Sequence, residues 1–300
     1  MPEGHTLFRL ARTLDEHFAG RVVSVTSPQG RFAESAAMLD GTRLDTAESY
    51  GKHLFVDFDD ERSVHVHLGL YGTFAVRDGE VPEPRGQVRM RFVAPAQGDR
   101  PPAYADLRGA TACELITVEQ RRGLLDRLGP DPLRADADWE RAWARVSRSR
   151  APVGGLLMDQ SVLAGVGNVY RAEVLFRHRL DPMRPGTSLR RATFEQVWND
   201  LVLLMADGVR RGRIDTVHVP GDPALVGRVP DAATHGSPVF VYRRQGEPCF
   251  VCGTRVRTEV LAGRNLFWCP RCQPRFRSRA GAARPPAPAR SDLPGGATAH

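Results

Sequence analysis

The chain has 300 residues, of which 41% are hydrophobic and 26% charged, a composition typical of globular proteins long enough for two domains with their own cores. No stretch approaches the roughly 20 consecutive apolar residues that a membrane-spanning helix needs, so we expect no membrane partner. The formal net charge is +7, and the excess is local. Residues 240–300 contain eleven arginines and three acidic residues, whereas the preceding part is nearly neutral. This distribution suits a nucleic-acid contact at the C-terminal end, and a solvated basic tail is the alternative.

The compartment is predicted from the N-terminus and the cysteines. Charge begins at the third residue, and the first residues contain no apolar signal core. We therefore expect a cytoplasmic protein. Its five cysteines are then reduced thiols or metal ligands and not a disulfide framework.

Short elements are predicted in the first third of the chain. An amphipathic helix covers residues 6–18, where the apolar side chains share one face and Gly20 ends the pattern. Alternating segments follow at residues 21–26, 53–58, 63–68, 73–77 and 87–93, with turn pairs such as Asp40-Gly41 between them. This rhythm favours an antiparallel β-sandwich with an N-terminal helix, over residues 1–116.

Helical patterns dominate after residue 116. A Gly-Pro-Asp-Pro stretch marks a linker over residues 117–136, and a helical domain is predicted over residues 137–222. Its helices are expected at residues 138–148, 153–159, 169–179 and 189–211. The glycine-rich turn at residues 161–168 can present backbone N–H groups to a phosphate, and an ordinary helix hairpin is the alternative.

The C-terminal third is predicted to contain one compact module. Residues 212–238 are rich in proline and glycine and are expected to be a connection, and residues 238–273 form the module. Residues 274–300 are biased toward proline, alanine, glycine and arginine, so they are expected to be a disordered basic tail.

Four cysteines have the spacing of a metal site. Cys249, Cys252, Cys269 and Cys272 form two Cys-x-x-Cys pairs separated by sixteen residues, which fits one tetrahedral zinc ion. Four thiolates leave no coordination position open, so the zinc is expected to be structural. Cys113 is expected to be a small buried hydrophobic residue.

The segment between the cysteine pairs has the length of a β-hairpin. It contains Arg255, Arg257 and Arg264, the last at the probable tip. A metal-pinned hairpin with an arginine at its tip is suited to binding phosphate. A zinc ribbon that docks a protein is the alternative.

Two features near the N-terminus are chemically unusual. Lys52 is the only lysine among 42 basic residues, which favours a role that a guanidinium cannot perform, such as titrating or acting as a compact charge. A chance surface lysine is the alternative. Removal of Met1 would give Pro2 a free secondary amine, able to attack an aldehyde carbon, and Glu3 beside it could be a general acid or base. His65 and His67 share a strand face, which is interpreted as an ordinary polar face because no third metal ligand is evident.

Taken together, these segments resemble the formamidopyrimidine-DNA glycosylase/endonuclease VIII family of bifunctional DNA glycosylases. The matching stretches lie in order along residues 2–273. They are Pro2-Glu3-Gly4, Tyr50-Gly51-Lys52-His53-Leu54, His67-Leu68-Gly69-Leu70-Tyr71-Gly72, Leu157-Met158-Asp159-Gln160 with Gly165-Val166-Gly167-Asn168-Val169-Tyr170, and the segment from Gly263 to Gln273.

The resemblance implies an α+β multidomain fold. It comprises an N-terminal helix on a two-layer antiparallel β-sandwich, a helix–two-turn–helix domain and a C-terminal β-hairpin zinc finger. It also implies a nucleoid-associated enzyme that binds damaged double-stranded DNA between its halves and flips the damaged nucleotide out. One structural Zn²⁺, no small-molecule cofactor and a monomer are expected.

The resemblance also implies roles for residues. Pro2 would form a Schiff base at C1′, Glu3 would protonate the sugar or the departing base, and Lys52 would contact a phosphate and assist elimination. Arg264 and Asn168 would hold phosphates beside the lesion, and Arg264 would donate a proton in the second elimination. The expected chemistry is β,δ-elimination, leaving a gap with a phosphate at both ends.

Sequence differences indicate the branch of the family. Leu70 and Tyr71 would fill the hole left by the flipped nucleotide, and Arg108 would also contact DNA. Phenylalanine does not follow Arg108, unlike in the oxidised-purine branch, so the chain is closer to the endonuclease VIII branch and oxidised pyrimidines. The alternatives are the same chemistry mainly on oxidised purines, or a non-catalytic protein that binds damaged DNA. The family's usual second proline and glutamate are replaced by His5 and Thr6, and a usual glutamine by Gly69.

Overall fold

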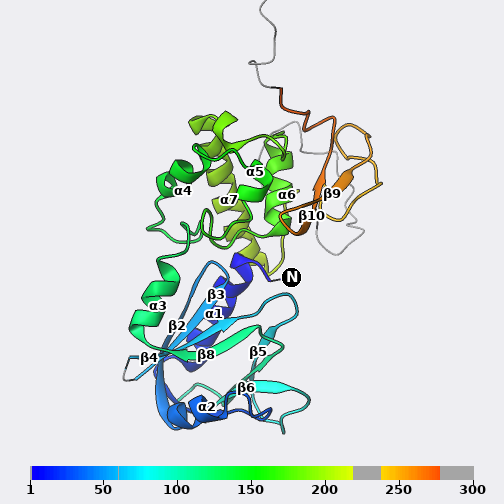
Figure 1. Cartoon of the computed structure of the whole chain (residues 1–300). Helices are drawn as coiled ribbons and strands as arrows, with labels where there is room; N and C mark the ends of the chain where they lie inside the picture. The colour runs from blue at the N-terminus through cyan, green and yellow to red at the C-terminus, as the bar shows by residue number, and fades with distance from the viewer. Residues whose placement is uncertain (1, 60, 219–237, 278–300) are drawn as a thin grey trace, which may run out of the picture.

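The computed structural model describes residues 2–59, 61–218 and 238–277. Residues 278–300, most of the predicted disordered tail, lie outside the described residues, as do residues 219–237 of the predicted connection. Figure 1 shows two halves, with most of the β-strands in one and most helices in the other. The N-terminus lies at the junction of the halves, and the hairpin β9–β10 lies beside the helical half.

The first half contains helix α1 (Gly4–Phe18) and one antiparallel sheet in the order β5-β7-β6-β1-β2-β3-β4-β8. The sheet folds into two layers at β1, because Arg21–Val23 pair with β2 and Ser24–Thr26 pair with β6. The strands are β1 (Arg21–Thr26), β2 (Thr42–Tyr50), β3 (His53–Phe58), β4 (Arg62–His67), β5 (Thr73–Asp78), β6 (Val88–Ala94), β7 (Ala103–Arg108) and β8 (Ala112–Ile116). The buried face of α1, with Leu7, Leu14 and Phe18, packs into the core between the layers.

These elements confirm the predicted β-sandwich and its N-terminal helix. The sequence patterns do not indicate strands β2, β7 and β8, or helices α2 (Ala33–Leu39) and α3 (Val118–Leu125). Helix α3 lies within the predicted linker and begins with a capping box, in which Thr117 and Gln120 bond each other's backbone N–H groups. Cys113 is buried, as predicted, at 3% exposure.

The second half consists of helices α4 (Trp139–Val146), α5 (Val153–Leu156), α6 (Asn168–Arg177) and α7 (Arg191–Arg211). Every residue of α6 is buried, so this helix runs through the centre of the half. Helix α7 packs on both α6 and α1 and thereby joins the two halves. No helix in the described ranges has the length and hydropathy that crossing a membrane requires.

The C-terminal module is the hairpin of β9 (Arg257–Leu261) and β10 (Arg264–Trp268). Its two-residue turn has positive φ at both positions, 51° at Ala262 and 70° at Gly263, as in a type I′ turn. Strand β10 packs against α6, which brings Arg264 back toward the junction of the halves.

Candidate active site

A cavity of about 250 Å³ lies where the N-terminus meets both halves and the hairpin. It is lined by Pro2, Lys52 and Arg264, although Pro2 and Arg264 are more than 200 residues apart in sequence. The other lining residues are Leu7, His67, Leu68, Gly69, Leu70, Met158 and Gln160. The structure thus brings three of the predicted catalytic residues to one cavity.

The fourth, Glu3, lies directly behind Pro2 and is fully buried. Its carboxylate accepts hydrogen bonds from the backbone N–H groups of Gly167 (3.1 Å), Val169 (2.8 Å) and Tyr170 (3.4 Å). It therefore occupies the N-terminal end of α6, where backbone donors and the helix dipole favour a carboxylate. Burial nevertheless raises the pKa of Glu3 above its usual value, against the opposing effects of Lys52 and these N–H groups. A raised pKa suits a group that must donate a proton.

Glycines permit the close approach of the N-terminus to this turn. A Cβ on Gly167 would lie 2.3 Å from Cδ of Glu3, so only glycine leaves room for the carboxylate. The N–H of Gly4 donates to the carbonyl of Gly165 (2.9 Å), and Gly165 has a φ of +85°, which favours glycine. The Gln160 side chain holds the same turn, since its Oε1 accepts from Gly165 N (3.0 Å).

Lys52 reaches the same turn from the other half. Its Nζ donates to the carbonyl of Val166 at 2.9 Å. Burial lowers the pKa of Lys52, the neighbouring Glu3 carboxylate raises it, and Arg264 lowers it further. Gly51, immediately before it, donates its N–H to the buried Asp131 carboxylate (2.7 Å). The only lysine is thus a partly buried, positioned group and not a free surface charge.

Arg264 is exposed at the hairpin tip, but the backbone beside it is held firmly. Asn168 donates from Nδ2 to the carbonyl of Asn265 (2.9 Å). The buried Arg171 donates to the same carbonyl (3.2 Å), to that of Leu261 (3.4 Å) and to Oδ1 of Asn168. Asn168 itself is only 6% exposed. The structure therefore shows Asn168 joining α6 to the hairpin, and its predicted phosphate contact stays a prediction.

Arg171 was not predicted as a functional residue. It lies three positions after Asn168 on α6, so the two side chains share a helix face. Helix α6 also contains Asn168, Glu173 and Arg177, so no sequence pattern distinguishes Arg171 from the other polar residues of this helix. Burial lowers the pKa of Arg171 to about 10, which leaves it charged at neutral pH.

The predicted wedge residues project from a tight turn beside the cavity. Tyr71 is 88% exposed and Leu70 44% exposed, so both side chains are accessible from outside the protein. The turn is closed by a hydrogen bond from Gly72 N to Leu68 O (3.0 Å). Gly69 has a φ of +68°, and a Cβ on it would lie 2.5 Å from Cγ2 of Thr111. This position therefore requires glycine.

Arg108 lies next to this loop, because it ends strand β7 and pairs with Thr73 at the start of β5. Its guanidinium donates to the buried Asp106 carboxylate (2.9 Å), which also receives two bonds from Arg91 (2.6 and 2.9 Å). The next residue, Gly109, lies close to Tyr71: a Cβ on Gly109 would be 3.4 Å from the carbonyl oxygen of Tyr71. Arg108 is thus placed beside the wedge loop but does not itself line the cavity.

His5 occupies a position where the family usually has another residue. It is 5% exposed and packs edge-on against the Tyr170 ring, with centroids 5.4 Å apart. Burial lowers the pKa of His5 to about 4, so it is neutral at neutral pH. The replacement supplies packing between α1 and α6 and no carboxylate.

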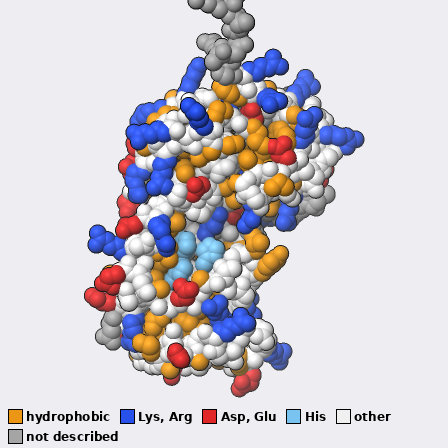
Figure 2. Space-filling model, in the orientation of Figure 1, with side chains coloured by type: hydrophobic (Ala, Val, Ile, Leu, Met, Phe, Trp, Pro, Cys, Tyr) orange, Lys and Arg blue, Asp and Glu red, His pale blue; other side chains and the backbone are white. Residues whose placement is uncertain are grey.

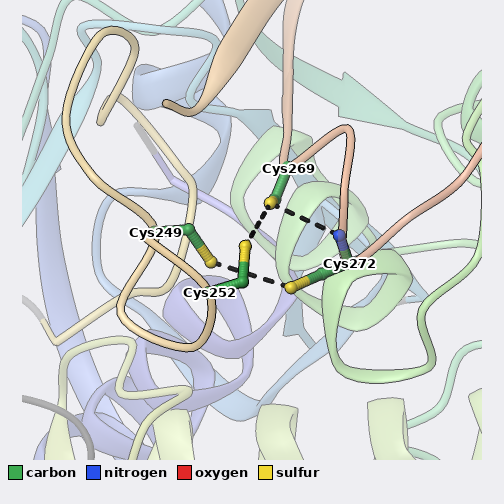
Figure 3. Close-up of side chains that lie close together, drawn as sticks. All are labelled: Cys249, Cys252, Cys269 and Cys272. Atoms are coloured by element: carbon green, nitrogen blue, oxygen red, sulfur yellow. Dashed lines mark hydrogen bonds between the residues drawn. The ribbon is translucent and has the colours of Figure 1, made fainter. Parts of the chain in front are cut away.

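The four predicted metal ligands converge in the C-terminal module (Figure 3). The Sγ atoms of Cys249, Cys252, Cys269 and Cys272 all lie within 4.8 Å of one another. Pairs are 3.9 Å (Cys249–Cys272) and 3.4 Å (Cys252–Cys269) apart. Tetrahedral zinc with Zn–S of about 2.3 Å requires sulfurs about 3.8 Å apart. The residues therefore fit one zinc-sized ion.

Comparison with known proteins agrees with this geometry. Three family models match: the formamidopyrimidine-DNA glycosylase N-terminal domain over residues 1–113, its H2TH domain over residues 128–219, and the zinc finger found in FPG and IleRS over residues 246–275. The chain belongs to the formamidopyrimidine-DNA glycosylase/endonuclease VIII family. Members of this family are DNA glycosylase/AP lyases of base excision repair. The predicted family and fold class are confirmed.

Relatives from both branches of the family cover nearly the whole chain. "Endonuclease 8 1" of Mycobacterium tuberculosis is 54% identical over 277 residues, covering 91% of this chain and 100% of the relative. "Formamidopyrimidine-DNA glycosylase" of Methylococcus capsulatus is 32% identical, with the same coverage of 91% and 100%. The Lactococcus lactis Fpg bound to abasic-site DNA has a TM-score of 0.72 at 19% identity, covering 91% of this chain and 100% of its own; it supports the fold.

Proposed function

We propose that this enzyme removes oxidised pyrimidines from duplex DNA and then nicks the strand by β,δ-elimination. The observation that carries the proposal is the shared cavity of Pro2, Lys52 and Arg264, with Glu3 buried behind it on α6. A nucleophile and two cations then line one sugar-sized space, with a proton donor buried behind the nucleophile.

The proposed chemistry begins at the amine of Pro2 once Met1 has been removed. The Pro2 nitrogen forms a bond to C1′ while the N-glycosidic bond breaks, and the base leaves with a proton. Glu3, whose pKa is raised, supplies the proton that the opening sugar or departing base requires. An α-amine has a pKa of roughly 8, against about 10.4 for lysine, so more of it is neutral and nucleophilic near pH 7.

Two eliminations then release the phosphates. Loss of a C2′ proton breaks the C3′–O bond, and the second elimination breaks the C5′–O bond, leaving a gap with phosphates at both ends. Lys52 and Arg264 would hold these phosphates and supply protons to them, and Asn168 and Arg108 would contact the strand on either side. Cations placed where negative charge develops are a large source of rate enhancement.

The lesion class is inferred from the wedge region. Leu70 and Tyr71 are exposed for insertion into the stack, and no phenylalanine follows Arg108 to add a second wedge. The "Endonuclease 8 1" relatives share 54% identity, against 32% for the "Formamidopyrimidine-DNA glycosylase" of M. capsulatus. Both observations favour oxidised pyrimidines over oxidised purines.

The remaining parts of the proposal concern assembly. One structural zinc ion would be held by the four cysteines, which fit its size, and would supply folding energy to the hairpin and no reactivity. We propose a monomer that acts in the cytoplasm on nucleoid DNA. Its domains would span residues 1–116, 137–222 and 238–273, with residues 117–136 as the linker.

Borohydride trapping tests this function directly. Duplexes carrying one thymine glycol, one 8-oxoguanine or one abasic site are incubated with the zinc-loaded protein, and the covalent adduct is quantified. We expect adducts on the thymine-glycol and abasic duplexes, loss of both in Pro2→Gly, and loss of the first but retention of the second in Glu3→Gln. Adducts on the 8-oxoguanine duplex in preference to thymine glycol would overturn the lesion class. The absence of any adduct, with duplex binding intact, would favour a non-catalytic damage-binding protein.

A further inference from the structure

Three histidines gather beside the active-site cavity without taking part in the proposed chemistry. His53 lies on β3, and His65 and His67 lie on the neighbouring strand β4. The His53 ring centroid is 5.2 Å from that of His65 and 5.1 Å from that of His67. Figure 2 shows histidine side chains at the surface below the junction of the halves. The interpretation of this strand face as merely polar therefore overlooks His53, which the fold adds to it.

The rings of His53 and His67 each have a partner on their Nδ1 atom. Nδ1 of His53 lies 2.9 Å from Nε2 of His65, and Nδ1 of His67 lies 2.9 Å from Oγ1 of Thr111. Within the described residues, Nε2 of His53 and Nε2 of His67 have no hydrogen-bond partner. A ring with one nitrogen engaged by a neighbour and the other free is the usual arrangement of a metal-ligating histidine.

The spacing of the two rings matches a shared ion. A metal lies about 2.1 Å from a ligating imidazole nitrogen and hence about 3.2 Å from the ring centroid. Two rings on one ion, at ligand angles of about 90° to 109°, then have centroids about 4.5–5.2 Å apart. The observed separation of His53 and His67 is 5.1 Å.

We propose that His53 and His67 form a second metal site, separate from the four cysteines, which binds a first-row transition-metal cation such as Ni²⁺ through both Nε2 atoms. Imidazole nitrogen is a preferred ligand of these ions. His65 and Thr111 orient the two ligand rings from behind. The Glu114 carboxylate, 4.0 Å from Nδ1 of His65, extends this outer shell and partly offsets the charge of the ion.

The surroundings set the character of the site. Burial lowers the pKa of His53 to about 3 and also lowers that of His67, so both rings are neutral, the form that binds metal. Lys52 and Arg127 are close enough to act on His53 and oppose a further cation. Among the described residues only the four cysteines form a group of three or more close ligands. The histidine pair therefore leaves coordination positions open to water, and binding is expected to be reversible.

A bound ion would interfere with catalysis, because His67 lines the same cavity as Pro2 and Lys52. This consequence, unlike the site itself, rests on the proposed function. The two positive charges of a bound Ni²⁺ beside Lys52 would compete with Lys52 for a DNA phosphate. We expect Ni²⁺ to inhibit strand cleavage of an abasic duplex at the concentrations at which it binds.

Calorimetric titration of the zinc-loaded protein with Ni²⁺, without DNA, tests the site independently of any enzymatic activity. We expect one Ni²⁺ per chain, with paramagnetic broadening of the His53 and His67 ring signals in the NMR spectrum and no release of zinc. His53→Gln should weaken the affinity at least tenfold. Loss of an outer-shell partner in the isosteric Thr111→Val should weaken it about tenfold or more. His17→Gln, which changes a histidine paired with Asp78 elsewhere on the surface, is the matched control and should bind as the parent does.

Several outcomes would overturn the site. They are the absence of saturable Ni²⁺ binding, equal affinity in His53→Gln and the parent, or Ni²⁺ uptake that releases an equivalent of zinc. Because Thr111→Val leaves both ligands in place, a reduced affinity in this folded variant would support the site even if His53→Gln failed to fold. Cleavage that is not inhibited in Ni²⁺-saturated protein would overturn the inhibitory consequence.

Discussion

Gly167 is the position at which the smallest added group should disable the active site. A Cβ there would lie 2.3 Å from Cδ and 2.5 Å from Oε1 of Glu3, closer than such atoms approach in proteins. The methyl group of Gly167→Ala must therefore displace the Glu3 carboxylate from the N-terminus of α6. The substitution changes no titratable group, so its effect reports on position alone.

The magnitude follows from the contacts that the carboxylate would lose. Its bonds from Gly167 N (3.1 Å) and Val169 N (2.8 Å) are the two shortest that hold it, and hydrogen bonds to charged groups contribute about 1.5–3 kcal/mol each. A positioned general acid contributes about 10²–10⁴-fold to a rate. We expect base excision to fall at least about 100-fold, and overpacking to lower the free energy of unfolding by about 1–3 kcal/mol.

Single-turnover excision of thymine glycol measures the first effect and thermal unfolding the second. Cleavage of a preformed abasic site should suffer less, because no base has to leave. Gly155→Ala on α5 is the matched control, since its Cβ would have only Ala262 Cβ nearby, at 4.0 Å, and it should excise as the parent does. If Gly167→Ala excised thymine glycol at the parent rate, Glu3 could not be the acid acting from this position.

Three further changes probe the metal, the hairpin tip and the lysine. Cys249→Ala should release zinc and weaken duplex binding, measured by metal analysis and fluorescence anisotropy; unchanged binding would show that the hairpin does not contact DNA. Arg264→Ala should reduce the salt dependence of binding by one phosphate contact, a change of about 0.9 in the slope of log K against log salt; an unchanged slope would place Arg264 away from the backbone. Lys52→Met removes a charge that lowers the pKa of Glu3, so the pH above which excision is lost should move upward, and a downward shift in the pH–rate profile would contradict this pairing.

The parts of the fold that could be predicted from sequence are those with local causes. The convergence of the cysteine pairs follows from their spacing, and α1 follows from one apolar face. Pro2, Glu3 and Lys52 were distinguished by residue chemistry and by the family resemblance. That Pro2 and Lys52 line one cavity with Glu3 buried behind it depends on the turn at residues 165–167, which no local pattern specifies.

Strand β7 shows why other elements were missed. It contains Asp106, which is buried and would normally argue against a core strand. Its charge is compensated by Arg91, which lies directly opposite on β6 and binds it through two nitrogens. Strand β2 is not predicted for a different reason. A register shift between Leu44 and Thr46 interrupts the alternation of its buried and exposed side chains. Both features are visible only once the neighbouring strand is known.

Helix α6 links the metal module to the acid at the N-terminus. Its first N–H groups bind Glu3, and Asn168 and Arg171 hold the hairpin turn. Glu173, also fully buried, accepts the N–H groups of Phe240, Val241 and Tyr242 at 2.7–2.8 Å, where the chain enters the module. Loss of the metal would loosen the attachment of Asn168 and Arg171 to the hairpin and that of Glu173 to the start of the module. The buried polar groups of α6 would then lose their partners, at about 1–3 kcal/mol for each. Zinc removal should therefore reduce the rate of base excision in bound duplex as well as affinity, because the helix that holds Glu3 is the helix that holds the hairpin.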